Sequence, residues 1–250
     1  MIAGKKILSV ITARAGSKGI KNKNVRELAE KPLVYWSIEA SVNSKYIDLT
    51  AISSNCDLVK EVVTNYVMDN KASFFINSEK PIIFIRRPEE LATDISKNEE
   101  ALMHAYDFLI DGYMLNFDII INLQPTSPIR NNFLIDQCIE RFIGEQADSL
   151  FTGSPHTPFF FRIENNEVIA EWDFKNRKMR QELERDGEMI FHDDGNIYIF
   201  SAKLLKETGC RMGGKISIFP TNKYQSLQID TEEDFMLIEK LVEANVITSL

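Results

Sequence analysis

Apolar residues follow two different rhythms in the first 150 residues, and the two alternate. Short, nearly continuous apolar runs are typical of buried strands, whereas apolar residues that recur every three or four positions are typical of helices. The predicted strands are 7–11, 49–53, 81–85 and 118–123, and the predicted helices are 32–42, 57–66, 96–109 and 133–142. This alternation predicts an α/β fold with a mostly parallel, doubly wound sheet, which binds ligands at the carboxyl ends of its strands.

The pattern changes beyond about residue 150. The later predicted strands are 148–153, 196–200, 215–219 and the short 227–230, and the closing helix is 231–242. Between them, residues 155–192 are rich in charged and aromatic side chains and show poor periodicity, so we expect an excursion from the main sheet. The sequence contains no internal repeat. We therefore expect a single domain over residues 1–250 that carries this excursion.

Positive charge is concentrated at the beginning of the chain. Residues 1–31 hold eight Lys and Arg against two Asp and Glu, a net charge of +6. The whole chain, with 29 basic and 37 acidic residues, carries −8, so the remainder carries −14. One positive region on an acidic protein indicates a small anionic substrate and argues against nucleic acid as the main partner.

Composition and cysteine usage indicate the class of protein. A hydrophobic content of 44% and a charged content of 26% are those of an ordinary globular protein. The longest apolar runs fall short of the ~20 residues that a membrane span needs. Cys56, Cys138 and Cys210 are scattered and show no metal-binding spacing, which indicates reduced thiols. We expect a cytosolic protein without a membrane partner.

The most informative segment is Arg-Ala-Gly-Ser-Lys-Gly-Ile-Lys-Asn-Lys-Asn at 14–24, directly after the first predicted strand. Its glycines allow backbone N–H groups to approach an anion closely, and its cations neutralise one. The spacing is not that of a P-loop. On spacing alone, a phosphate cradle and a solvated surface turn explain this loop equally well.

Two further polar segments follow predicted strands. Gln-Pro-Thr-Ser-Pro-Ile-Arg at 124–130 projects polar side chains at the carboxyl edge, or is a proline-rich turn. Arg86 and Arg87 open the segment 86–94 and are able to hold a triphosphate or a base edge, or to form a surface salt-bridge cluster. Ser96 with Glu99 has the pattern of a capping box.

Carboxylates near the end of the chain are candidates for a metal site. Asp230 directly precedes the last predicted helix and is suited to Mg²⁺, whereas Thr231 with Asp234 forms a capping-box pattern. His192-Asp193-Asp194 is a second acidic cluster, for which a solvated turn is the favoured interpretation. The spacing suggests no Ser–His–Asp or Cys–His arrangement.

Taken together and in order, these segments resemble the acylneuraminate cytidylyltransferase family, the CMP-sialic acid synthetases. The resemblance covers nearly the whole chain, and its first and fourth segments are the most specific. The matching segments are Ala-Arg-Ala-Gly-Ser-Lys-Gly-Ile at 13–20 with Lys-Asn at 23–24, Lys-Pro-Leu at 31–33, Arg-Pro-Glu-Glu-Leu-Ala-Thr-Asp at 87–94, Leu-Gln-Pro-Thr-Ser-Pro-Ile-Arg at 123–130, Arg-Gln at 180–181, Gly-Asn-Ile-Tyr-Ile-Phe at 195–200 and Ile-Asp-Thr at 229–231.

The resemblance implies a Rossmann-like nucleotide-diphosphosugar transferase fold. It also implies transfer of CMP from CTP to a nine-carbon 2-keto acid sugar with release of pyrophosphate, a requirement for Mg²⁺, and a homodimer in which residues 155–192 reach into the neighbour's site. The anomeric hydroxyl would attack the α-phosphorus in line, so the protein's task is positioning and charge neutralisation.

The resemblance also assigns roles residue by residue. Those implied to hold the triphosphate are Arg14, Ser17, Lys18 and Lys23. Those implied to contact the cytidine are Asn24, Arg87, Ser96 and Asn98. Those implied to contact the acidic sugar are Gln124, Arg180 and Tyr198, with Arg180 matching the arginine that pairs with the sugar carboxylate. Asp230 is implied to bind Mg²⁺, and it is grouped with Arg14, Lys18 and Lys23 as catalytic.

Some positions depart from the family's pattern. The family usually has Asp-x-Asp where this chain has Gln228-Ile-Asp230, so a two-carboxylate metal site is in doubt. The Phe triplet at 159–161 makes the sugar pocket unusually aromatic. Two alternatives stay open: a cytidylyltransferase for an eight-carbon 2-keto acid, which usually has an acidic residue in place of the Gln-Pro-Thr-Ser-Pro segment, and a catalytically impaired CTP-binding protein.

Overall fold

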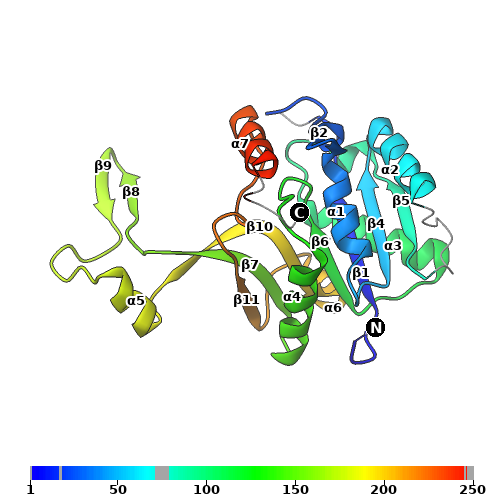
Figure 1. Ribbon diagram of the computed structural model, residues 1–250. Helices are drawn as coiled ribbons and strands as arrows, with labels where there is room; N and C mark the ends of the chain where they lie inside the picture. Colours follow the sequence, from blue (N-terminus) through cyan, green and yellow to red (C-terminus); the bar gives the residue numbers. More distant parts are fainter. Residues whose placement is uncertain (1, 17–18, 71–78, 245, 247–250) are drawn as a thin grey trace.

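The computed structural model describes residues 2–16, 19–70, 79–244 and 246. Within them, seven strands form one sheet in the order β11-β7-β10-β6-β1-β4-β5 (Figure 1). The strands are β1 (Ile7–Thr12), β4 (Leu49–Ser54), β5 (Ile82–Arg86), β6 (Ile119–Leu123), β7 (Ser149–His156), β10 (Ile190–Ser201) and β11 (Ile216–Pro220). β10 runs antiparallel to both of its neighbours and the other pairs are parallel, which confirms the mostly parallel sheet.

Helices cover both faces of this sheet. The apolar sides of α1 (Leu33–Val42), α2 (Asp57–Asp69) and α4 (Asn132–Gly144) pack on one face. On the other face lie α3 (Asn98–Tyr113) and α6 (Ala202–Thr208). Strands buried on both faces are nearly continuous apolar runs, which is why the sequence pattern located them. No helix of the described residues is long and apolar enough to span a membrane.

A third, smaller core joins the end of the chain to its beginning. Phe235 and Ile238 of α7 (Glu232–Glu243) pack with Ile20, Trp36 and Ile129, and the short strands β2 (Glu27–Leu28) and β3 (Lys31–Pro32) form a hairpin beside them. Thr231 begins α7 as the expected capping box with Asp234. This cluster holds the loop after β1, the loop after β6 and α7 together at one edge of the sheet.

Residues between β7 and β10 form an arm that projects from the body (Figure 1). It carries the hairpin of β8 (Phe161–Glu164) and β9 (Glu167–Ala170) and the short helix α5 (Arg180–Asp186). Phe159, Phe161, Trp172 and Phe174 form a chain of ring contacts with centroid distances of 5.0 to 6.5 Å. The poor periodicity of 155–192 thus hides ordered elements, organised by aromatic contacts instead of a sheet face.

Three sequence-based expectations were wrong. Residues 227–230 form no strand, because Ile229 N–H donates to the Thr126 carbonyl at 2.8 Å, across to the loop after β6. The capping box of α3 pairs Lys97 with Glu100, one residue later than predicted: the Lys97 N–H donates to the Glu100 carboxylate at 3.0 Å. His192-Asp193-Asp194 belongs to β10 and is no solvated turn: buried Asp194 accepts the Thr152 hydroxyl at 2.6 Å.

Candidate active site

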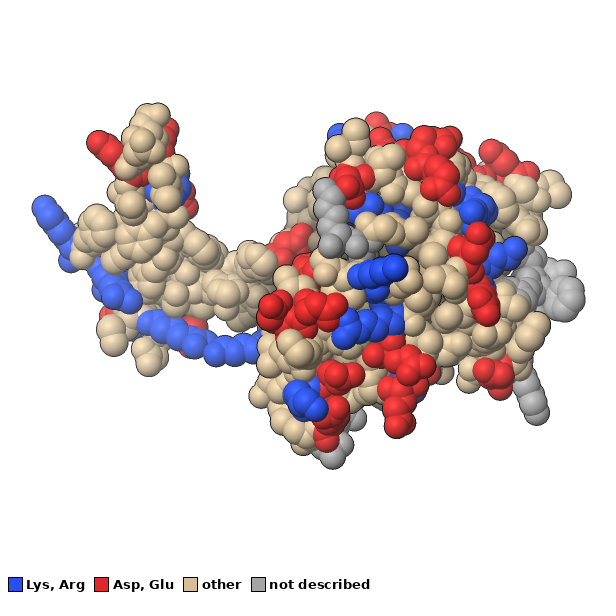
Figure 2. Space-filling view, turned by 90° about the horizontal axis from the view of Figure 1, so that it is seen from above, with Lys and Arg blue, Asp and Glu red and all other residues tan. Residues whose placement is uncertain are grey.

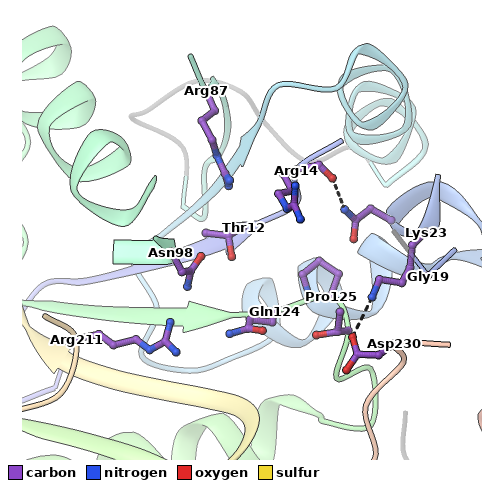
Figure 3. A pocket seen from close by; sticks show the side chains of 12 residues that line it. Thr12, Arg14, Gly19, Lys23, Arg87, Asn98, Gln124, Pro125, Arg211 and Asp230 are labelled. Atoms are coloured by element: carbon purple, nitrogen blue, oxygen red, sulfur yellow. Dashed lines mark hydrogen bonds and ion pairs between the residues drawn. The ribbon is translucent and has the colours of Figure 1, made fainter. Parts of the chain in front are cut away.

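The loops after β1, β5 and β6 converge on a cavity of about 490 Å³ at the carboxyl edge of the sheet (Figure 3). This confirms the edge that the strand order predicted. The residues that line the cavity are Thr12, Arg14, Gly19, Lys23, Asn24, Arg87, Asn98, Gln124, Pro125, Thr126, Arg211 and Asp230. Figure 2 looks onto this edge and shows Lys and Arg side chains gathered near the middle of the body, with Asp and Glu around them.

The loop after β1 is held from within. The Asn24 side-chain amide donates to the Arg14 carbonyl at 3.0 Å and closes the loop on itself. The Arg14 guanidinium donates to the Ala92 carbonyl at 3.3 Å and pairs with Asp94 at 3.0 Å. The loop is therefore anchored to the segment after β5, and it is no free surface turn.

Lys23 is the most enclosed of the described cations of this loop, with 8% of its surface exposed. Its Nζ donates to the Ile229 carbonyl at 2.6 Å and pairs with the Asp230 carboxylate at 3.2 Å. Gly19 lies so close to Asp230 that a Cβ at this position would overlap the Asp230 carbonyl oxygen. Two segments more than 200 residues apart in sequence therefore form one wall of the cavity.

Arg87 is buried at the end of β5, with 4% exposed. Its Nε donates to the Ser53 hydroxyl at 3.0 Å and Nη2 to the Ser53 carbonyl at 2.8 Å. Burial first, and then the nearby Arg14 cation, lower the pKa of Arg87 to about 10, so it stays charged at neutral pH. The adjacent Arg86 is exposed and pairs with Asp57, so the surface salt bridge describes Arg86, whereas a ligand contact stays a prediction for Arg87.

Asn98 and Gln124 bring amide groups to the cavity. The Asn98 amide donates to Asn122 Oδ1 at 2.7 Å, and Asn122 in turn donates to the Val10 carbonyl at 3.1 Å. Gln124 projects from the loop after β6. Its carbonyl accepts from Arg130, a fully buried guanidinium whose burial lowers its pKa to about 9. Arg130 also donates to the Asn196 side chain at 3.1 Å, so it fixes the Gln124 loop against β10.

Three of the assigned residues do not line this cavity. The Ser96 hydroxyl donates to the Glu90 carbonyl at 2.9 Å and accepts from Thr93 N–H, so it organises its own loop. Tyr198 is buried and donates its hydroxyl to Asp193 at 2.8 Å, and its burial raises its pKa. Arg180 lies on the arm, 60% exposed, where it pairs with Glu184 at 2.8 Å and lines a separate cavity with Ser154 and His156. Ser17 and Lys18 lie outside the described residues.

Sequence reasoning missed Arg211. It lies in the turn between α6 and β11, and its guanidinium reaches the cavity across the ring of Tyr198, with Cζ 4.0 Å from the ring centroid. No motif marks this position, because the turn follows a helix, whereas the motifs were sought in loops that follow parallel strands. The signal available was indirect: a lone arginine beside the Gly-Gly pair at 213–214.

The carboxylates of the described residues do not gather into a multi-ligand metal centre. The described residues contain no group of three His, Cys, Asp or Glu side chains able to share one ion. The Gln228 side chain donates to the Asp194 carbonyl and packs on Gly195, while Asp230 faces Lys23. Asp230, with 66% of its side chain exposed, is the acidic residue among those that line the cavity.

Comparisons with known proteins identify the family of this chain. The family model described as cytidylyltransferase matches residues 8–249. The chain is 30% identical over 251 residues to a CMP-N,N'-diacetyllegionaminic acid synthase of Legionella pneumophila, covering 96% of this chain and 97% of that protein. It is 28% identical over 244 residues to a pseudaminic acid cytidylyltransferase of Campylobacter jejuni, covering 96% and 97%.

A solved structure gives the same fold. A CMP:2-keto-3-deoxy-manno-octonic acid synthetase complexed with CTP superposes with a TM-score of 0.62 over 96% of this chain and 99% of that one, at 13% identity. The family match extends over nearly all of the chain. The cavity of the protein is lined by loops in which the sequence resemblance was found. The protein is a nucleotidyltransferase that belongs to the cytidylyltransferase family.

Proposed function

We propose that the protein transfers CMP from CTP to the anomeric hydroxyl of a nine-carbon, acylneuraminate-type 2-keto acid sugar and releases pyrophosphate. The observation that carries the proposal is the cavity at the carboxyl edge, in which Arg14, Lys23 and Arg87 gather beside the amides of Asn98 and Gln124. The names of the two relatives, which act on pseudaminic and legionaminic acids, make sugars of that kind the first acceptors to test.

The residues divide the work by position. Arg14 and Lys23 hold the triphosphate, Arg87 with Asn24 and Asn98 holds the cytidine, and Gln124 orients the acceptor. The acceptor hydroxyl forms a new bond to the α-phosphorus, the α–β bridging P–O bond breaks, pyrophosphate departs with the bonding electrons, and the hydroxyl proton is released to solvent. Cations fixed before the reaction stabilise the developing charge without reorganising.

Magnesium fits the site as an ion shared between protein and nucleotide. Mg²⁺ is usually held by one or two carboxylates together with substrate phosphates, and Asp230 offers one accessible carboxylate at the cavity wall. The ion would neutralise phosphate charge. Gln228 turns its amide toward Asp194, so this proposal assigns it a structural contact and no part in metal binding.

The arm supports a homodimer. Three large apolar side chains of the arm are mostly exposed: Ile163 by 77%, Val168 by 70% and Phe174 by 67%. Exposed apolar side chains that lie together mark a site of protein–protein contact. We propose that a second copy covers these side chains and that Arg180 acts in the neighbour's cavity. In one chain Arg180 lines the separate cavity at the root of the arm.

The test is release of pyrophosphate from CTP and Mg²⁺ with a panel of acidic sugars. Turnover is expected with at least one nine-carbon 2-keto acid such as sialic, legionaminic or pseudaminic acid. Preference for an eight-carbon acid would establish the alternative acceptor class. Binding of CTP in calorimetry without turnover of any acceptor would overturn the enzyme assignment in favour of an impaired CTP-binding protein.

A further inference from the structure

The cavity contains a cation that the nucleotide assignment does not use. Arg211 is supplied by the turn between α6 and β11, on the β10 side of the cavity. In Figure 3 it lies at one side, Lys23 and Asp230 lie at the other, and Gln124 lies between them. The cavity thus presents a second, separate positive position next to the residue proposed to orient the acceptor.

Arg211 is held in place without using its terminal nitrogens. Its guanidinium stacks 4.0 Å above the Tyr198 ring, and Tyr198 is itself fixed by hydrogen bonds of 2.8 and 3.0 Å to Asp193. Arg211 Nε forms an ion pair with the Glu99 carboxylate at 3.6 Å, which leaves Nη1 and Nη2 for a ligand, and 19% of the Arg211 side chain is exposed. A cation stacked on a rigid aromatic ring loses little conformational freedom when it binds a ligand.

The other cavity cations already donate hydrogen bonds through their terminal nitrogens. Arg14 bonds Ala92 and Asp94, Lys23 bonds Ile229 and Asp230, and Arg87 bonds Ser53. In the part of the chain that the structure describes, Arg211 makes no hydrogen bond through Nη1 or Nη2. A guanidinium with both terminal N–H groups available matches a carboxylate in a bidentate arrangement.

The proposed reaction brings two anions into one cavity, and they need separate cations. The triphosphate occupies the side of Arg14 and Lys23. The acceptor carries its carboxylate on the same anomeric carbon that bears the reacting hydroxyl. In its own chain Arg180, which the family resemblance assigned to this carboxylate, lines another cavity, and in the proposed dimer it reaches this cavity only from the neighbouring copy. Arg211 is present in the same chain and in the same cavity as Gln124.

We propose that Arg211 binds the carboxylate of the acceptor sugar and thereby selects acidic acceptors. The inference rests on the proposed function and extends it to one specific contact. Bound in this way, the carboxylate fixes the orientation of the adjacent anomeric hydroxyl toward the nucleotide. This role also explains why Arg211 stacks on Tyr198, because the stacking keeps the guanidinium extended toward the cavity when no substrate is bound.

The test compares Arg211→Met with wild type, using the sugar acid and its carboxamide as paired acceptors. Wild type is expected to favour the acid strongly. In Arg211→Met the KM for the acid should rise about 10- to 100-fold, the value for the amide should change little, and the Kd for CTP should be unchanged. Arg211→Lys should restore part of the preference. Lys203→Met, a charge removal on α6 with 80% of the side chain exposed, serves as the matched control.

The outcomes separate this inference from the function on which it rests. If wild type transfers CMP to no acidic sugar, the proposed function fails and the assignment falls with it. If wild type is active and Arg211→Met still prefers the acid over the amide to the same extent, the assignment to Arg211 is overturned while the function stands. Loss of that preference in Arg180→Met alone would identify the arm as the carboxylate-binding element.

Discussion

The proposed nucleotide side of the cavity, around Lys23 and Arg87, and the arm are built in opposite ways. Lys23 and Arg87 are 8% and 4% exposed, and each is held by a main-chain carbonyl and a side chain far away in sequence. Arg180 on the arm is 60% exposed and pairs with Glu184, four residues away on the same helix. The arm also exposes large apolar side chains such as Ile163 and Phe174.

This difference separates what one chain completes from what it leaves incomplete. Buried cations with several fixed partners are preorganised for an anion. Folding of the rest of the chain offsets the free energy needed to remove these cations from water. Exposed local ion pairs contribute about 0 to 1 kcal/mol and fix little. The described cations of the proposed nucleotide side therefore have their partners within one chain, whereas the arm exposes the surface that we propose a second copy covers.

The largest effect is expected from removing Lys23. Lys23→Met deletes the buried cation that links the loop after β1 to Asp230, so kcat/KM should fall by about 100-fold or more. Pyrophosphate release measures this. Lys21→Met removes an exposed cation from the same loop and should change the rate by less than about threefold. Equal losses would show that general charge, and not the buried position, matters.

The next largest effect concerns the close contact within the nucleotide side. In Gly19→Ala the new methyl group meets the Asp230 carbonyl, so the loop after β1 has to move away from Lys23 and Asp230. If the whole overpacking cost of about 1–3 kcal/mol opposes binding, the CTP Kd should weaken by about 5- to 150-fold. Gly112→Ala on α3, where nothing lies within 4 Å, is the control. Unchanged CTP affinity in Gly19→Ala would show that this wall is pliable.

A change on the arm tests the other half of the comparison. Ile163→Asp places a charge on the exposed apolar surface, and the dimer dissociation constant should rise about tenfold or more while the melting temperature of the body stays the same. Light scattering over a dilution series measures this. Met114→Asp, at an 89% exposed position on the body, should leave the dimer intact. A wild-type protein that is monomeric at micromolar concentration would contradict the proposal.

The smallest effect is a pH dependence on the nucleotide side. Burial lowers the pKa of Arg87 to about 10, so the cation persists below that pH and is lost above it. The ratio of CTP Kd values between Arg87→Met and wild type should change by less than about twofold from pH 7 to pH 9, and should shrink only near pH 10. A ratio that already declines between pH 7 and 8 would mean that Arg87 is far less basic than its surroundings dictate.

Sequence patterns located the sheet more accurately than the local connections. Six of the seven strands of the described sheet lie within three residues of their predicted bounds, because burial on both faces produces apolar runs that are visible along the chain. The exception is β10, which begins six residues before the predicted 196. Residues 227–230 gave a false strand because their apolar members face the small core with Ile129 and Phe235. Periodicity detects burial, but it does not identify the partner against which a segment is buried.

The cavity was predictable where segments after parallel strands, or the family resemblance, marked its residues. Arg14, Lys23, Asn24, Arg87, Asn98, Gln124 and Asp230 were identified from sequence and all line it. Arg211 was missed because its approach depends on the antiparallel strand β10 and on the stacking surface of Tyr198. Ser96 and Tyr198 share motifs with the site, yet their hydroxyl groups are satisfied by Glu90 and Asp193.

The sequence by itself determined the order of strands and helices, the mostly parallel sheet and the edge at which polar loops gather, because these depend on periodicity and on the rule that parallel strands end together. Only the tertiary structure decided which cations share the cavity and which are left with free donors. Those contacts join residues such as Lys23 and Asp230, or Tyr198 and Arg211, whose pairing depends on packing geometry. The spacing of residues along the chain carries no record of that geometry.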